Sequence, residues 1–225
     1  MYFYPMHITD ELVSVLGASQ KIVPYLDMPL QHANDTMLRR MARRVTRAET
    51  EALLDKLRAN IPNLVMRTTF IAGFPGETDE QFADLVDFVE RQRFERAGVF
   101  TYSLEPDTPA ANLPDHVPEE VKEARREQLM AIQQQIAFDW NERQVGRTLD
   151  VILDQPVPQE KNVWVGRSYA DAPDVDGLVF VTGDKRDRLA AGQIVPVEIV
   201  ASQGYDLVGV ATRGARPKSA LPVLQ

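Results

Sequence analysis

The chain has 225 residues, of which 44% are hydrophobic and 26% charged, and this is the composition of a soluble globular protein with room for one or two domains. It contains no cysteine, which excludes disulfides and metals bound through thiolates. Its net charge of −8 lacks the cationic excess of a nucleic-acid binder. No apolar run reaches about 18 residues and no signal peptide precedes the first strand, so we predict a cytoplasmic location without a transmembrane helix.

Strands and helices alternate through the first two thirds of the chain. The apolar patterns predict strands over residues 1–4, 22–28, 63–72 and 97–103. Helices are expected over residues 10–18, from Asn34 or Asp35 onward, after Thr46, after Thr78, and from Pro118 to about Val145. Thr46 and Thr78 each open a capping box, in which the threonine and a Glu or Gln three residues later satisfy free backbone amides. The alternation predicts an α/β domain with parallel strands joined by right-handed crossovers.

The pattern changes near residues 144–148. Short β-branched segments separated by turns follow at residues 149–153, 162–168, 177–182, 194–201 and 205–212. Their spacing predicts a small all-β barrel of about five strands. We therefore expect an α/β domain over residues 1–145, a barrel domain over 146–213 and a flexible tail over 214–225.

The turn from Gly73 to Glu77 follows a predicted strand and opens a predicted helix. Ligands of barrels built from parallel strands bind at the carboxyl ends of the strands, and glycines there let backbone approach a ligand closely. Taken alone, the turn also fits an ordinary strand-to-helix connection with a glutamate at the positive end of the helix dipole. Phe74 and Pro75 lie between its two glycines.

Polar side chains lie on the strand that leads into this turn and at the end of the strand before it. Gln31 and His32 end one strand, where an amide can bond a ribose or a carboxylate. Arg67 shares a strand face with Ile71 and, if that face is inside a barrel, it needs a carboxylate from Asp27 or from a ligand.

Several other features favour ordinary structural explanations. The basic run of Arg39, Arg40, Arg43, Arg44 and Arg47 is interpreted as a solvated helix face, in preference to a nucleic-acid patch. The three histidines lack the spacing of zinc ligands, so no metal site is expected. The aspartate-rich stretch at residues 171–176 is compatible with a turn, in which aspartate is common for local reasons, and also with a surface that would repel phosphate and suit a basic protein.

Four segments carry a family resemblance: residues 25–32, 69–78, 102–111 and 166–177. They resemble the later part of the barrel of radical S-adenosylmethionine (SAM) methylthiotransferases and the TRAM domain that follows it. The implied fold is an incomplete radical SAM (β/α) partial TIM barrel and a small OB-like barrel. The resemblance implies that Ile71, Gly73, Phe74 and Pro75 flank the adenine of SAM, that Gln31 contacts its ribose, and that Arg67 faces its methionyl carboxylate. The segment at 102–111 resembles the loop that closes the mouth of the active site.

The aspartate-rich stretch is similar to the branch of the family that modifies the twelfth protein of the small ribosomal subunit. Members of that branch attach a methylthio group to the β-carbon of an aspartate, using SAM and two 4Fe–4S clusters held by cysteines. Since those cysteines are absent, we expect a C-terminal fragment that is inactive alone, whether a shortened gene model, a cut piece or one half of a natural split protein. Its expected substrate is a ribosomal protein.

Three alternatives remain open at this level. The first is a fragment of the related enzyme that methylthiolates adenosine in transfer RNA, although that branch more often carries serine after the glutamine at position 31 and a basic TRAM domain. The second is a non-catalytic module that uses the small barrel to hold RNA or a protein. The third is a degenerate remnant without function.

Overall fold

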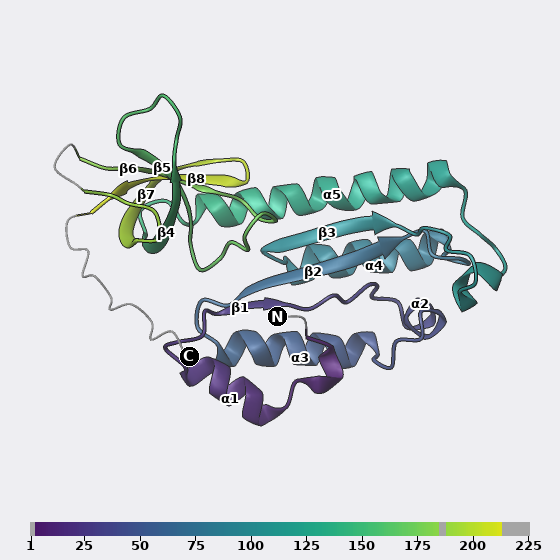
Figure 1. Cartoon of the computed structure of the whole chain (residues 1–225). Coiled ribbons are helices and arrows are strands. Elements are labelled where there is room, and N and C mark those ends of the chain that lie inside the picture. The colour runs from purple at the N-terminus through teal and green to yellow at the C-terminus, as the bar shows by residue number, and fades with distance from the viewer. Residues whose placement is uncertain (1–2, 185–187, 213–225) are drawn as a thin grey trace. The chain divides into compact units, whose positions relative to one another are not determined.

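The computed structural model describes residues 3–184 and 188–212, and the contacts within the chain divide it into two compact units, residues 1–136 and 137–225 (Figure 1). The division falls inside α5 (Glu119–Glu142), so the domain limits expected from the sequence stay a prediction. The tail expected to be flexible, residues 214–225, lies outside the described residues.

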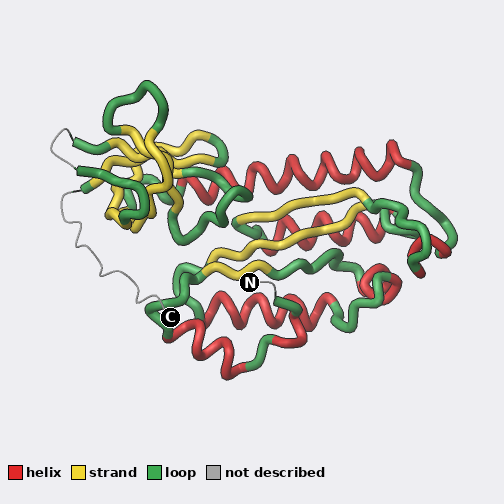
Figure 2. Tube along the Cα trace, in the orientation of Figure 1, coloured by secondary structure: helices red, strands yellow, loops and turns green. Residues whose placement is uncertain are grey.

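The first unit is a parallel sheet with helices between its strands (Figures 1 and 2). Its elements are η1 (Pro5–His7), α1 (Asp10–Ala18), β1 (Tyr25–Asp27), α2 (Asp35–Arg40), α3 (Arg47–Asn60), β2 (Val65–Ala72), α4 (Asp79–Gln92), β3 (Arg96–Thr101), η2 (Pro109–Asn112) and the greater part of α5. The strand order is β1-β2-β3, and both pairs are parallel. The α/β class and the parallel pairing predicted from the sequence are confirmed.

One predicted strand is wrong. Residues 3 and 4 belong to no strand, and the 3₁₀ turn η1 begins at Pro5, so the described part of this sheet has three strands where the sequence suggested four. The backbone amide of Phe3 does donate to the carbonyl of Asp27 at 3.0 Å. A single bond of this kind aligns the segment with β1, but Pro5 lacks the backbone N–H that would continue a ladder.

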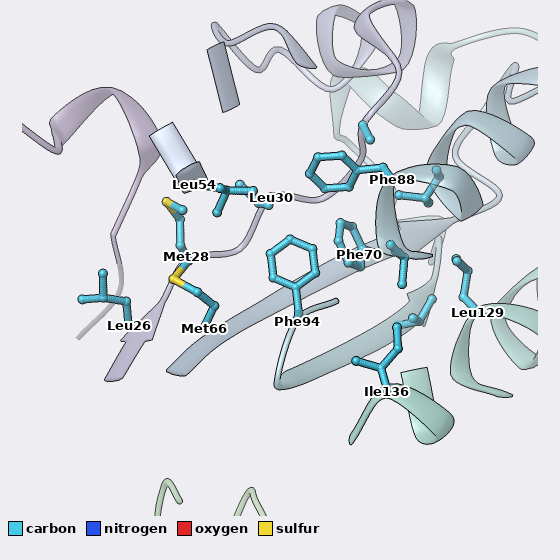
Figure 3. Close-up of a cluster of buried hydrophobic side chains, with 14 of the residues drawn as sticks. Leu26, Met28, Leu30, Leu54, Met66, Phe70, Phe88, Phe94, Leu129 and Ile136 are labelled. Carbon is cyan, nitrogen blue, oxygen red and sulfur yellow. The ribbon is translucent and has the colours of Figure 1, made fainter. Parts of the chain in front are cut away.

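The core of the first unit lies on one face of β2. Met66, Phe70 and Ala72 are buried there, whereas Arg67 and Ile71 on the opposite face are only half-buried. Helices α3, α4 and α5 contribute much of the cluster through Leu54, Leu57, Phe82, Leu85, Phe88, Val89, Leu129 and Ile136. Figure 3 shows four of these side chains, Leu54, Phe88, Leu129 and Ile136, beside Met66 and Phe70 of β2. Each fully buried large side chain contributes about 1.5–3 kcal/mol, so the helices are held to one face and the other is left for polar groups.

Both predicted capping boxes are present. The hydroxyl of Thr46 accepts from the amide of Glu49 at the start of α3, and the Glu49 carboxylate accepts from the Thr46 amide. Thr78 and Gln81 repeat this exchange at the start of α4. The second box matters for the site because it fixes the point at which the Gly73–Glu77 turn enters its helix.

Glu95, just before β3, is partly buried and accepts the amide of Met66 at 2.8 Å. Desolvation by burial raises its pKa, although the Met66 bond and the cations Arg58 and Arg96 oppose the rise. Because the folded-state pKa lies above the unfolded value, the stability linked to Glu95 is fully present below the unfolded pKa and is lost as pH rises through the folded one.

The variant Glu95→Gln keeps a carbonyl for the Met66 amide and removes this titration. Its stability relative to the parent chain is therefore expected to increase as pH rises from about 4 to 7, by about 1.4 kcal/mol for each unit by which folding raises the pKa. Urea unfolding at a series of pH values measures the difference. Parallel stability curves for the two proteins would contradict it.

The second unit contains a closed barrel of five strands, which confirms the number and type of strands predicted. They are β4 (Thr148–Pro156), β5 (Val163–Arg167), β6 (Val179–Thr182), β7 (Ile194–Gln203) and β8 (Asp206–Ala211), in the order β4-β5-β6-β8-β7. Alternate residues point inward, and the interior is filled by Leu149, Val151, Leu153, Val179, Val181, Val195, Val197, Ile199 and Leu207. The barrel thus has a packed core of its own.

Between β5 and β6, the aspartate-rich stretch uses two of its carboxylates locally. Asp171 accepts from both the amide and the hydroxyl of Ser168, at 3.0 and 2.6 Å. Asp176 accepts from the amide of Ala172 at 2.8 Å. These bonds support the turn interpretation for Asp171 and Asp176, whereas Asp174 is exposed and has a left-handed backbone with φ 61°. Nearby, Arg167 binds Asp154 through two nitrogens at 2.9 Å, and this hydrogen bonding raises the arginine pKa.

Candidate functional site

A pocket of about 430 Å³ opens where β1 and β2 end. Four pieces of chain form it: Gln31 in the segment that follows β1, the end of α2 with its following turn, the end of β2 with its turn, and the segment after β3 that includes η2. The lining residues are Gln31, Arg40, Met41, Ala42, Arg43, Ile71, Phe74, Thr108, Pro109 and Ala110. The location agrees with the rule that parallel α/β sheets bind ligands at the carboxyl ends of their strands.

Gln31 is held in an unusual backbone conformation at the edge of the pocket. Its φ is 73°, which costs a non-glycine residue about 1–2 kcal/mol. Two hydrogen bonds to the neighbouring strand maintain it, from the Gln31 amide to the Thr69 carbonyl at 2.8 Å and from the Ile71 amide to the Gln31 carbonyl at 2.9 Å. Within residues 3–184 and 188–212, no protein group bonds its carboxamide, which is therefore available to a ligand.

The turn below the pocket is organised by a buried carboxylate. The side chain of Glu77 is fully buried and accepts from the Gly73 amide at 3.0 Å, from Arg125 at 2.8 Å and from His32 at 3.2 Å. Arg125, on α5, also donates to the exposed Asp79 at 2.7 Å. A carboxylate that satisfies three donors joins the ends of β1 and β2 to α5 at one point.

The hydrogen bonds of His32 define its tautomer. Its Nδ1 lies 2.9 Å from the amides of both Ala33 and Asn34, so that nitrogen accepts and carries no proton. Nε2 must then bear the hydrogen that is donated to Glu77. His32 is thus a neutral structural hydrogen-bonding residue.

Each of the two glycines in the turn has the side chain of a cationic residue packed against its backbone. Gly73 has φ +72°, and a Cβ there would lie 2.3 Å from Cγ of Lys122. Gly76 has φ +80°, and a Cβ there would lie 2.6 Å from the guanidinium carbon of Arg40. Lys122 in turn donates to the carbonyl of Tyr102 at 3.0 Å. The turn therefore needs glycine for its backbone conformation and for the close approach of these two cations.

The six residues expected from the sequence occupy different positions relative to the pocket. Gln31, Ile71 and Phe74 line it, whereas Gly73 and Pro75 are buried in the adjoining turn. Arg67 shares the face of β2 with Ile71 but forms an ion pair with Asp27 at 2.7 Å, which was one of the two partners considered. A contact of Arg67 with SAM stays a prediction, and the ion pair would have to be shared or broken to make one.

The basic run after Asn34 is more varied than a solvated helix face. Arg39 and Arg44 are exposed, as expected, but Arg40 and Arg43 are partly buried and line the pocket. Arg47 forms ion pairs with Glu51 and Asp87, and the hydrogen bonds to these two carboxylates raise its pKa against the opposing, and largest, effect of burial. Sequence reasoning missed the two pocket arginines, because helical spacing alone does not show which side of a short helix meets a loop from far along the chain.

Family comparisons agree with the two units. Residues 4–89 match the radical SAM superfamily and residues 145–212 match the TRAM domain. The coproporphyrinogen III oxidase HemN of Escherichia coli, a radical SAM enzyme, has a similar fold with a TM-score of 0.52, at 23% identity over 63% of this chain and 33% of its own. The first unit thus has the fold of part of a radical SAM protein, and the barrel is a TRAM domain.

Curated relatives are much more similar in sequence. The ribosomal protein uS12 methylthiotransferases RimO of Desulfitobacterium hafniense and Lachnoclostridium phytofermentans are 48% and 47% identical over 93% of this chain. That of Thermosynechococcus vestitus is 45% identical over 96% of it. The chain belongs to the radical SAM methylthiotransferase family. It spans about half the length of these curated relatives, which it covers to 46–47%.

The residues of this chain fit one cofactor of the family, SAM, but not the other, the iron–sulfur clusters. SAM fits the pocket, because Gln31 offers an unbonded carboxamide, Ile71 and Phe74 offer apolar surface, and a buried nitrogen of Arg40 lacks a partner in the described chain. The iron–sulfur clusters do not fit, because the sequence has no cysteine, and the described residues contain no group of three or more potential metal-binding side chains. No helix within the described ranges is long and apolar enough to cross a membrane.

Proposed function

We propose that this chain is part of a radical SAM methylthiotransferase that methylthiolates the β-carbon of an aspartate in the small-subunit ribosomal protein uS12. The similarity at 45–48% identity to proteins that carry the uS12 methylthiotransferase name, over nearly the whole chain, carries the proposal. Ribosomal protein modification of this kind would place the protein in the cytoplasm. The proposed partner is uS12, with RNA binding by the TRAM domain secondary because the chain has a net charge of −8.

Within this function the pocket would hold the adenosyl part of SAM. Gln31 would bond the ribose through its free carboxamide, and Ile71 and Phe74 would contact the adenine. Gly73 and Pro75 would act through the shape of the turn, which Glu77 and Arg125 hold in place. In the complete enzyme, bound SAM would supply the radical chemistry of the reaction. The residues of this chain bind and orient the cofactor and limit the access of water.

The chain by itself is expected to cleave no SAM. A radical SAM reaction needs an iron–sulfur cluster held by cysteine thiolates, and this sequence contains none. The purified protein, treated with iron, sulfide and a reductant, should therefore produce no 5′-deoxyadenosine by liquid chromatography and mass spectrometry. Turnover above the level of a protein-free control would overturn the fragment interpretation.

The function itself is tested by exchange of homologous segments. Residues 4–212 of this chain would replace the matching half of the D. hafniense relative, in a strain that lacks its own uS12 methylthiotransferase. We expect uS12 purified from the ribosomes to gain one methylthio group at a single aspartate. A chimera that cleaves SAM but modifies transfer RNA, or leaves uS12 unmodified, would contradict the proposed function.

A further inference from the structure

Two arginines line the pocket, and neither has a carboxylate partner in the part of the chain that the structure describes. Among the described residues, the only hydrogen bond of Arg40 is to the carbonyl of Pro114, at 3.4 Å, and its buried Nε has no hydrogen-bond partner. Arg43 donates to the carbonyl of Pro29 at 2.5 Å and lies 5.0 Å from the ring of Tyr4. Other arginines of the first unit, such as Arg125, bind carboxylates directly.

Leaving these cations unpaired has a physical cost. A guanidinium withdrawn from water loses hydration that a carbonyl or an aromatic ring replaces only in part. At Arg43 this cost is visible in the pKa, which burial lowers although Tyr4 acts in the opposite direction. A bound anion would compensate both side chains and would satisfy the free Nε of Arg40.

The pocket presents these groups in a fixed arrangement. The guanidinium of Arg40 lies over the backbone of Gly76, where any side chain at position 76 would displace it. Met41, Ile71 and Phe74 supply apolar walls around the charged groups. A pocket volume of about 430 Å³ suits a small ligand or one or two side chains.

The chemistry favours a carboxylate over a phosphate chain. The planar fork of an arginine matches the oxygens of a carboxylate and of a phosphate equally well, so the charge of the surrounding protein decides between the two ligands. Polyphosphate or nucleic acid would instead meet a protein with a net charge of −8, with only the exposed Arg39 and Arg44 added beside the pocket.

We propose that Arg40 and Arg43 make this pocket a carboxylate-binding site. The proposal rests on the proposed function, whose reactants carry two carboxylates: the methionyl group of SAM and the side chain of the substrate aspartate. Either one offers the same chemistry to the arginines, and matched ligands distinguish the two sources.

The test measures binding to the full 225-residue chain by titration calorimetry with two pairs of ligands. The first pair is SAM and decarboxylated SAM. The second is a peptide spanning the modified aspartate of uS12 and the same peptide with asparagine in its place. Each is titrated against the parent chain and the variants Arg40→Gln, Arg43→Gln and Arg44→Gln. Arg44 is exposed and lies outside the pocket, so its variant is the control for a general loss of positive charge.

We expect the parent chain to prefer the carboxylate member of one pair by about tenfold or more. Arg40→Gln and Arg43→Gln should reduce that preference to near unity, and Arg44→Gln should leave it unchanged. Preference within the SAM pair would identify the cofactor as the source, and preference within the peptide pair would identify the substrate. Arg40→Lys keeps the positive charge without the planar fork and should retain part of the preference. It is the control for a loss of binding that results from misfolding of the Arg40→Gln variant.

The proposal is overturned if neither pair is discriminated, or if discrimination survives in both pocket variants while their thermal unfolding matches that of the parent. Failure of the proposed function has a different signature, since a chimera that leaves uS12 unmodified could still bind one carboxylate through Arg40. Conversely, a chimera carrying Arg40→Gln that still modifies uS12, with unchanged KM for both substrates, would contradict the carboxylate site and leave the proposed function intact.

Discussion

Glu77→Ala is expected to destabilise the first unit by about 3–5 kcal/mol, the cost of removing one member of a buried ion pair. The alanine would leave Arg125 with a buried positive charge facing the space that Glu77 occupies, and the Nε2 hydrogen of His32 and the Gly73 amide without acceptors. Urea unfolding followed by helical circular dichroism reports this change, because every α-helix of the described chain begins in the first unit.

The amide variant provides a sharper comparison. Glu77→Gln can accept from Gly73 and Arg125 through its oxygen, but its NH₂ group would face the Nε2 hydrogen of His32, and His32 cannot change tautomer without losing two backbone bonds. We therefore expect an intermediate loss of about 1–3 kcal/mol. Glu80→Ala, at an exposed position in the first turn of α4, should change stability by less than about 0.5 kcal/mol. A Glu77→Ala loss as small as that of Glu80→Ala would refute the assigned role of the network.

Gly73→Ala is expected to have the second largest effect. At φ +72° an alanine costs about 1–2 kcal/mol in backbone strain. Its Cβ would also lie 2.3 Å from Cγ and 3.0 Å from Cβ of Lys122, so the lysine stem must move and its bonds to Tyr102 and Glu119 are lost. Such overpacking adds about 2 kcal/mol, and because the turn borders the pocket, SAM binding should weaken as well.

Gly146 separates the two contributions to this effect. Its φ is +84°, and a Cβ there would meet nothing within 4 Å. Gly146→Ala should therefore show the backbone strain alone, about 1–2 kcal/mol, and leave ligand binding unchanged. Urea unfolding followed by helical circular dichroism measures the loss for Gly73→Ala, and unfolding followed by the fluorescence of Trp140 and Trp164, which both lie in the second unit with Gly146, measures the loss for Gly146→Ala. Equal losses would show that Lys122 adjusts freely and that the close packing has no energetic weight.

Much of the fold could be predicted because its signals are local. The capping boxes at Thr46 and Thr78 involve residues three apart, and the five barrel strands follow an alternation that spans only a few residues each. The strand expected over residues 1–4 was wrong because a short apolar segment becomes a strand only if a neighbour offers it a ladder, and here one bond to Asp27 is all the described part receives.

The amino-acid sequence by itself determined the α/β and barrel units, the family, the absence of cluster ligands and three of the residues that line the pocket, Gln31, Ile71 and Phe74. Only the tertiary structure decided that Arg67 pairs with Asp27, that Glu77 joins His32 to Arg125, and that Arg40 and Arg43 face the pocket. The physical reason is distance along the chain. Helix caps and strand alternation depend on neighbouring residues, whereas these contacts join side chains 40 or more positions apart or depend on loops whose course no local pattern encodes.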